Sequence, residues 1–137
     1  MDDKARLLAR VPLFSQLDAA ALKHVETLVD QVDVDAGTVL MTEGRTGREF
    51  FIILSGTVAV SRNGHPLATL GPGDYLGEIA LVDDGPRTAT ATAETAARLL
   101  VLAHREFHSL LDEHPGVRMA VLQSLAQRVR NLDAQAT

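Results

Sequence analysis

The sequence predicts a mainly β protein with flanking α-helices, built as a jelly-roll-like β-barrel with short N-terminal helices and C-terminal helices. Two patterns predict this fold. Short apolar segments recur at even spacing between glycine-containing turns through residues 31–103, and the apolar residues on either side recur at helical spacing. The length of 137 residues is that of one domain. We therefore expect a single domain over residues 1–137, with helices in 2–30, the barrel in 31–103 and helices in 105–134.

Two helices are expected before the barrel. The first covers Asp2–Arg10, and Pro12 stops it. The second follows Asp18, a good N-cap residue. Its apolar residues recur at helical spacing, at Leu22, Val25, Leu28 and Val29.

The barrel is expected to consist of short strands separated by turns. Asn63-Gly64 is the strongest hairpin signal, because a two-residue turn of this type needs positive φ at both positions. The expected strands are Val32–Val34, Val39–Met41, Glu49–Leu54, Thr57–Ser61, Leu67–Leu70, Thr88–Ala93 and Arg98–Ala103.

The helical period returns after the barrel. A short helix is expected over Arg105–Asp112, and Pro115 suits the first position of a longer one. That last helix carries an apolar stripe of Val117, Ala120, Val121, Leu125, Val129 and Leu132.

Composition excludes several function classes. A net charge of −5 argues against non-specific adhesion to nucleic acid or to a membrane, since both depend on an excess of Lys and Arg. The chain has no cysteine, and therefore neither disulfides nor thiolate chemistry, and it has no signal segment or membrane-length apolar run. A cytoplasmic location is expected.

The most informative segment is Gly77–Leu81 followed by Pro86–Thr90, because it places the carboxylate of Glu78 and the guanidinium of Arg87 close together in the chain. A carboxylate can accept from ribose hydroxyls, and the planar fork of arginine matches the two exocyclic oxygens of a cyclic phosphodiester. Residues after Gly77 are expected to form one helical turn, whose first N–H groups would face an anion. The pair therefore suits a ribose cyclic phosphate.

This segment closely resembles the phosphate-binding cassette of the cyclic nucleotide-binding domain family, which includes catabolite activator proteins, regulatory subunits of cyclic-AMP-dependent kinase and cyclic-nucleotide-gated channels. Other landmarks of the family follow in the same order over nearly the whole chain, at Val11–Ser15, Glu43-Gly44, Phe50–Gly56 and Gly71–Asp74. Arg48 and Phe51 depart from the family pattern, outside the cassette, where an acidic residue and a tyrosine are common.

The resemblance implies a role for each cassette residue. Arg87 binds the phosphate, Glu78 accepts from the ribose 2′-hydroxyl, and Leu76 contributes to an apolar wall against the base. The backbone N–H groups expected to complete the anion site belong to Gly77, Glu78, Ile79, Ala80, Thr88 and Ala89.

The resemblance also implies a sensor or regulatory domain whose ligand is cAMP or cGMP, with cAMP favoured. Because of Thr88, cGMP is retained as a possible ligand: its hydroxyl can form a hydrogen bond either to the phosphate or to the guanine edge. The C-terminal helix is expected to close over the base, with Leu132 or Asp133 as the capping residue. The same helix could pack against a second copy of the chain or an effector protein.

Two other functions are compatible with a jelly-roll fold. A cupin-type metalloenzyme shares the jelly roll but needs histidines on strands inside the barrel. Here His65 is expected in the hairpin turn, and the rest fall on or beside helices, at His24, His104, His108 and His114. These histidine positions do not suit a metal site inside the barrel, so no metal site is expected. No serine has an adjacent base in a recognisable arrangement, so no enzyme is expected either.

A protein-interaction module that keeps the fold without a ligand is the other alternative, although the presence of Glu78 and Arg87 weighs against it. In catabolite activator proteins a helix-turn-helix follows the long helix, whereas this sequence stops at Thr137, so no direct DNA binding is expected. Either a stand-alone domain or the sensor of a longer protein would fit.

Overall fold

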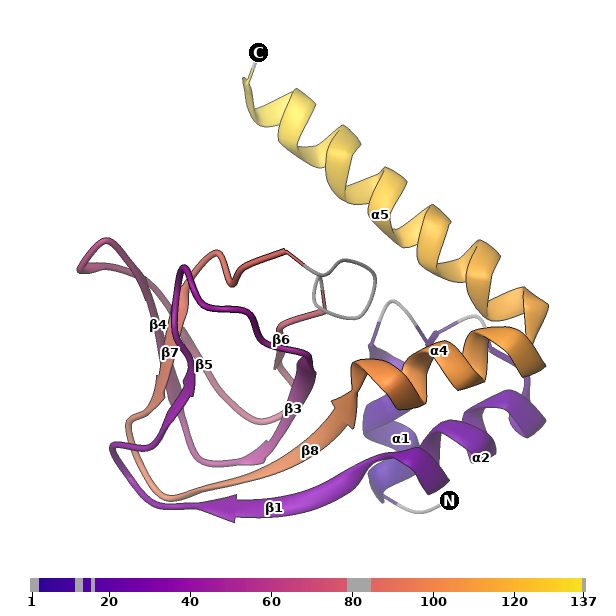
Figure 1. Ribbon diagram of the computed structural model, residues 1–137, viewed down its shortest axis with the longest axis horizontal. Coiled ribbons are helices and arrows are strands. Elements are labelled where there is room, and N and C mark those ends of the chain that lie inside the picture. The colour runs from indigo at the N-terminus through magenta and orange to yellow at the C-terminus, as the bar shows by residue number, and fades with distance from the viewer. Residues whose placement is uncertain (1–2, 12–13, 16, 79–84, 137) are drawn as a thin grey trace. The chain divides into compact units, whose positions relative to one another are not determined.

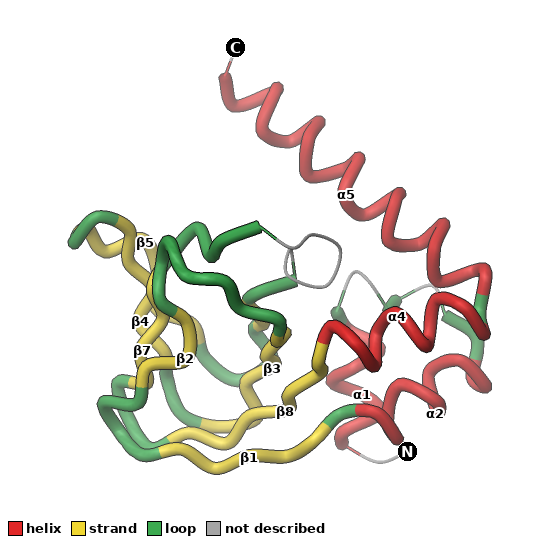
Figure 2. Tube along the Cα trace, viewed as in Figure 1, coloured by secondary structure: helices red, strands yellow, loops and turns green. Residues whose placement is uncertain are grey.

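The computed structural model describes residues 3–11, 14–15, 17–78 and 85–136 (Figure 1). These residues form two compact units: the first combines residues up to Thr27 with those from His108 onward, and the second is Leu28–Phe107. Figure 2 shows the strands gathered in the second unit and most of the helical residues in the first.

The second unit consists of two four-stranded antiparallel sheets. One has the order β1-β8-β3-β6 and the other β2-β7-β4-β5. The strands of the first sheet are β1 (Asp30–Val34), β8 (Ala97–Ala103), β3 (Glu49–Ser55) and β6 (Tyr75–Leu76). Those of the second are β2 (Val39–Met41), β7 (Thr90–Ala93), β4 (Val58–Arg62) and β5 (His65–Leu70). Non-consecutive strands pair within each sheet, as in a jelly roll, and the predicted fold class is confirmed.

The barrel core receives side chains from both sheets. Phe51 and Ile53 of β3 and Leu99 of β8 pack with Val58 of β4 and Ala91 of β7. Phe50, Ile52, Leu100 and Leu102 are also buried, so β3 and β8 are covered on both faces. This explains why these two segments are continuous apolar runs instead of alternating ones.

The first unit contains α1 (Asp3–Arg10), α2 (Ala19–Leu28), most of α4 (His104–Glu113) and α5 (Pro115–Ala136). The predicted N-cap is present: the N–H of Ala21 donates to Asp18 Oδ1 over 2.8 Å. Pro115 occupies the first position of α5, also as predicted. Buried apolar side chains of this unit include Leu8, Val11, Phe14, Ala21, Val25, Leu110 and Val117.

The strand and turn predictions were accurate where the backbone preferences of neighbouring residues determine the structure. Asn63 and Gly64 have φ of 52° and 78°, which confirms the two-residue hairpin turn. His65 was expected in that turn, but it is the first residue of β5 and pairs with Arg62. The strand expected from Thr88 begins only at Thr90, and the preceding residues Pro86 and Arg87 are bound to the loop after β2 instead.

The short strand β6 was not predicted, and the helical turn expected after Gly77 falls on residues 79–84, outside the described residues. Among the described helices, none combines the length and apolarity needed to cross a bilayer.

Candidate functional site

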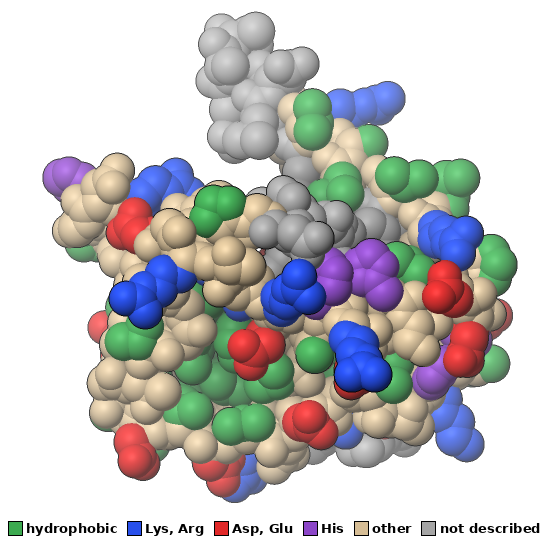
Figure 3. All heavy atoms as spheres, viewed as in Figure 1, with side chains coloured by type: hydrophobic (Ala, Val, Ile, Leu, Met, Phe, Trp, Pro, Cys, Tyr) green, Lys and Arg blue, Asp and Glu red, His purple; other side chains and the backbone are tan. Residues whose placement is uncertain are grey.

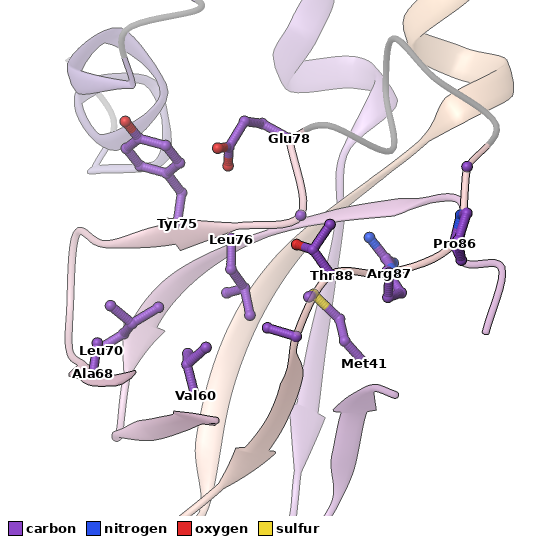
Figure 4. A pocket seen from close by; sticks show the side chains of 13 residues that line it. Met41, Val60, Ala68, Leu70, Tyr75, Leu76, Glu78, Pro86, Arg87 and Thr88 are labelled. Carbon is purple, nitrogen blue, oxygen red and sulfur yellow. The ribbon is translucent and has the colours of Figure 1, made fainter. Parts of the chain in front are cut away.

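A pocket of about 250 Å³ lies in the barrel unit beside the predicted cassette. Figure 4 shows Val60, Ala68 and Leu70 at one end and Pro86 and Arg87 at the other. Its polar side chains are concentrated near the cassette, so it combines an apolar wall with a polar end. The lining residues are Met41, Val60, Ala68, Leu70, Tyr75, Leu76, Gly77, Glu78, Gly85, Pro86, Arg87, Thr88 and Ala89.

Arg87 is the one buried charged or polar side chain among the described residues, with 8% of its surface exposed. Its Nη2 donates to the backbone carbonyl of Glu49 over 2.8 Å, and its guanidinium carbon lies 6.0 Å from the ring centroid of Phe51. No carboxylate of the described residues forms an ion pair with it. A buried cation without an anionic partner is costly, so this guanidinium favours an anionic ligand.

Burial lowers the pKa of Arg87 below its ordinary value, and the nearby charge of Glu49 opposes that shift. Arginine nevertheless keeps its proton in proteins. The pocket therefore presents a permanent positive charge at its polar end.

Two glycines make room for the guanidinium. A Cβ at position 47 would collide with Arg87 Nε and would lie 2.7 Å from its Cζ. A Cβ at position 77 would lie 2.9 Å from Arg87 Nη1 and 2.8 Å from the carbonyl oxygen of Glu49. Gly77 also has φ of +84°, a conformation that other residues rarely adopt. The position of Arg87 thus depends on the absence of side chains at 47 and 77.

Backbone hydrogen bonds hold the Arg87 segment in place. The N–H of Arg87 donates to the carbonyl of Arg45 over 2.8 Å, and the N–H of Gly44 donates to the carbonyl of Arg87 over 2.9 Å. Thr46 and Pro86 form an antiparallel bridge next to them. The loop between β2 and β3 therefore acts as a clamp on the cassette.

Glu43 joins three segments around this clamp. Its carboxylate accepts from the backbone N–H of Asn63 over 3.0 Å, and its own N–H donates to Thr90 Oγ1 over 3.0 Å. In addition, Arg62 Nε donates to the carbonyl of Thr88 over 2.8 Å. The β4–β5 hairpin is thereby tied to the cassette, which gives the Glu43-Gly44 pair a structural role.

The turn at Gly71–Asp74 positions the other side of the pocket. The N–H of Gly71 donates to Asp74 Oδ2 over 2.8 Å, and the carbonyl of Asp74 accepts from the N–H of Ile53 over 2.9 Å. Pairing of Leu76 with Phe51 then directs Leu76 into the barrel. Glu78 follows two residues later, half-buried at the pocket.

The structure brings most of the predicted site residues together. Those that line the pocket are Leu76, Gly77, Glu78, Arg87, Thr88 and Ala89. Ile79 and Ala80 lie outside the described residues. Leu132 and Asp133 belong to α5 in the other unit, and their side chains are also outside the described part of the structure.

Several lining residues were not predicted. Val60 lies two residues after the core residue Val58, and it pairs with Ala68 across the hairpin, while Val58 pairs with Leu70. These residues could have been found by extending the inward face of each strand at a period of two. Met41, Tyr75, Gly85 and Pro86 were missed as well.

Comparisons with known proteins identify the family of the chain. The family model described as "Cyclic nucleotide-binding domain" matches residues 31–114. The chain is 30% identical over 129 residues to a CRP-like cAMP-activated global transcriptional regulator of Mycobacterium tuberculosis, covering 90% of this chain and 58% of that protein. It is 40% identical over 107 residues to a cAMP-dependent protein kinase regulatory subunit of Yarrowia lipolytica, covering 76% of this chain and 28% of that protein.

A similar fold occurs in the crystal structure of the N-terminal domain of a transcriptional regulator from Streptomyces coelicolor A3(2). The TM-score is 0.85 and the identity 33%, over 96% of this chain and 95% of that one. The chain thus spans nearly all of this domain, but just over half and about a quarter of the two curated relatives. The family match covers more than half of the sequence, and the chain belongs to the cyclic nucleotide-binding domain family.

Proposed function

We propose that the chain binds a cyclic purine nucleotide in this pocket and serves as a sensor or regulatory domain, not as an enzyme. The observation that carries the proposal is Arg87, a buried guanidinium without an ionic partner among the described residues, at the polar end of an apolar pocket. A cyclic phosphate would supply its counter-charge, so no metal ion is needed there.

In this proposal the phosphate lies against Arg87, the ribose beside Glu78 and the base against Val60, Leu70 and Leu76. Of the residues whose backbone N–H groups are expected to complete the anion site, the described ones are Gly77, Glu78, Thr88 and Ala89, and all four line the pocket. The apolar wall supports the base by burial, which does not by itself distinguish adenine from guanine.

The direct test is calorimetric titration of the purified protein with cAMP and with cGMP, after removal of any bound nucleotide by unfolding and refolding. We expect saturable binding of one nucleotide per chain. Absence of binding to both would favour the alternative, a protein-interaction module that keeps the fold without a ligand.

We favour cAMP, because the regulator and the kinase subunit that resemble this chain both carry cAMP in their names. Thr88 is an exposed side chain at the pocket and can test this choice. If its hydroxyl contacts guanine, Thr88→Ala will weaken cGMP binding about fivefold more than cAMP binding, the equivalent of about 1 kcal/mol for one hydrogen bond. Equal losses would remove the argument for cGMP. Thr69→Ala, on an exposed position of β5, is the matched control.

Glu78→Gln keeps the shape of the side chain and one acceptor but removes the charge. We expect a loss of about 1–2 kcal/mol, or about 5- to 30-fold in affinity, because a hydrogen bond to a charged group becomes a neutral one. A 2′-deoxy nucleotide lacks the same contact, so the two losses should be non-additive in a double-mutant cycle. Full additivity would contradict a direct bond between Glu78 and the ribose. Glu94→Gln, on an exposed loop position, should leave affinity unchanged.

We also propose that α5 is the moving element and closes over the base through Leu132 or Asp133. Of its described side chains, only Val117 and Ala120 are buried, both in its first two turns. Met119, Leu122 and Val129 are 56–62% exposed, and hydrophobic side chains are visible on the surface of α5 in Figure 3. A helix end with so few buried contacts can change its environment at little cost.

Hydrogen exchange on the free and nucleotide-saturated protein tests this movement. The amides of residues 125–133 should exchange readily in the free protein and become protected with saturating nucleotide, because a ligand shifts an equilibrium only by binding one state better. Protection confined to residues 77–89 would show binding without helix closure.

The expected partners follow from the surface. Acidic and basic side chains are interspersed on the face shown in Figure 3, and the net charge is −5, which does not suit a phosphate backbone. We propose a cytoplasmic domain that does not contact DNA directly. The exposed apolar residues of α5 are the surface that a second copy or an effector would cover.

A further inference from the structure

The helical unit contains a cluster of potential metal ligands, separate from the nucleotide pocket. His24 lies on α2, Glu113 ends α4, and His114 is the single residue between α4 and α5. One ligand atom from each of the three lies within 4.8 Å of the other two. We propose that these residues bind one divalent transition-metal ion, with Zn²⁺ as the best match.

The spacing of the ligand atoms fits a tetrahedral ion. His24 Nδ1 is 3.1 Å from His114 Nε2 and 3.4 Å from Glu113 Oε2. Bonds of about 2.0–2.2 Å from zinc to nitrogen and oxygen place neighbouring ligands of a tetrahedron about 3.3–3.6 Å apart, so the two imidazole nitrogens need to separate only slightly to admit the ion. The ring centroids of His24 and His114 are 5.2 Å apart with planes tilted by 60°, so the rings meet through their nitrogens instead of stacking.

Backbone hydrogen bonds and buried neighbours fix the positions of the two histidines. The N–H of His114 donates to the carbonyl of Leu110, and the carbonyl of His114 accepts from the N–H of Val117, each over 2.9 Å. Leu110 and Val117 are fully buried, which anchors His114 from both sides. His24 lies on α2 between the buried residues Ala21 and Val25. Its side chain is 25% exposed and that of Glu113 is 60% exposed, so an ion can enter from solvent.

The donor set determines the class of ion. Two imidazoles and a carboxylate suit zinc and its neighbours among the first-row metals, and a water would complete the tetrahedron. Mg²⁺ and Ca²⁺ require mainly oxygen ligands and should not compete. A bound ion would link α2 to the junction of α4 and α5 within this unit. This inference is independent of nucleotide binding and departs from the expectation that the chain has no metal site.

The experiment is equilibrium dialysis of chelator-treated protein, free of any histidine tag, against Zn²⁺ with metal analysis. We expect one Zn²⁺ per chain, unaffected by excess Mg²⁺, with weaker binding on acidification because imidazoles bind metal only when deprotonated. Zn²⁺ should also raise Tm, since it binds only the folded arrangement of these ligands. Absence of stoichiometric binding would mean that His24 and His114 share only a hydrogen bond, and would overturn the proposal.

Variants locate the ion. His24→Gln should weaken Zn²⁺ binding about 100-fold, since loss even of groups behind the ligands costs about 10- to 100-fold. Glu113→Gln changes an exposed side chain, so folding is preserved and a loss of about tenfold or more is expected. His65→Gln, at an exposed strand position, should bind like the original protein. If His24→Gln and Glu113→Gln bind Zn²⁺ as tightly as the original protein, or if His65→Gln binds it more weakly, the ion binds elsewhere and the proposal is overturned.

Discussion

Replacing Arg87 with leucine is expected to weaken cyclic nucleotide binding by about 100-fold or more. The planar guanidinium fork can donate two charge-assisted hydrogen bonds to the phosphate, and hydrogen bonds to charged groups contribute about 1.5–3 kcal/mol each. Calorimetric titration of the variant with cAMP measures the loss. Arg87→Lys keeps the charge but not the planar fork, so its affinity for cAMP should lie between that of the unmodified protein and that of Arg87→Leu.

Arg98→Leu is the matched control. It removes the same charge, but Arg98 forms an exposed pair with Asp33 through a 2.9 Å contact and does not line the pocket. Its affinity for nucleotide should equal that of the unmodified protein. Because Arg87 is buried, thermal unfolding must show that Arg87→Leu is folded at the titration temperature. A folded Arg87→Leu protein that binds within a few-fold of the original would contradict the phosphate assignment.

Gly47→Ala is expected to lower affinity about tenfold or more while changing stability little. The added methyl group must displace the guanidinium of Arg87, whose Cζ would otherwise lie 2.7 Å away. A shifted guanidinium loses at least one of its two bonds to phosphate, about 1.5–3 kcal/mol. The arginine side chain can rotate away and φ at Gly47 is ordinary, so folding should survive. Titration with cAMP and thermal unfolding together measure the two effects.

Gly71→Ala controls for the extra methyl group. Nothing lies within 4 Å of a Cβ at position 71, and its φ is ordinary. This variant should match the unmodified protein in affinity. Equal affinities for Gly47→Ala and Gly71→Ala would mean that Arg87 need not occupy its present position to bind nucleotide.

Local rules explain why much of the fold was predictable. Asn63-Gly64 specifies its turn through its own backbone preference, and Asp18 caps α2 with its own side chain. The strand β6 has only two residues, Tyr75 and Leu76, and exists because β3 pairs with it across the sheet. No local pattern marks such a strand, so it could not be predicted from the sequence.

The site shows the same division. The chemistry of Glu78 and Arg87 was readable because both lie in one segment, and both line the pocket. The burial of Arg87 was not readable, because it depends on a loop 40 positions away: the carbonyl of Arg45 and the space at Gly47. The same limit hid the meeting of His24 with His114, which are 90 residues apart without a metal-binding motif.

We propose that this pocket holds the cyclic phosphate against Arg87. The most direct measurement is a crystal structure of the protein saturated with cAMP. We expect phosphate oxygens within hydrogen-bonding distance of the Arg87 guanidinium, the ribose 2′-hydroxyl against the Glu78 carboxylate, and the base against Val60 and Leu70. A nucleotide bound outside this pocket, or with its phosphate directed away from Arg87, would contradict it.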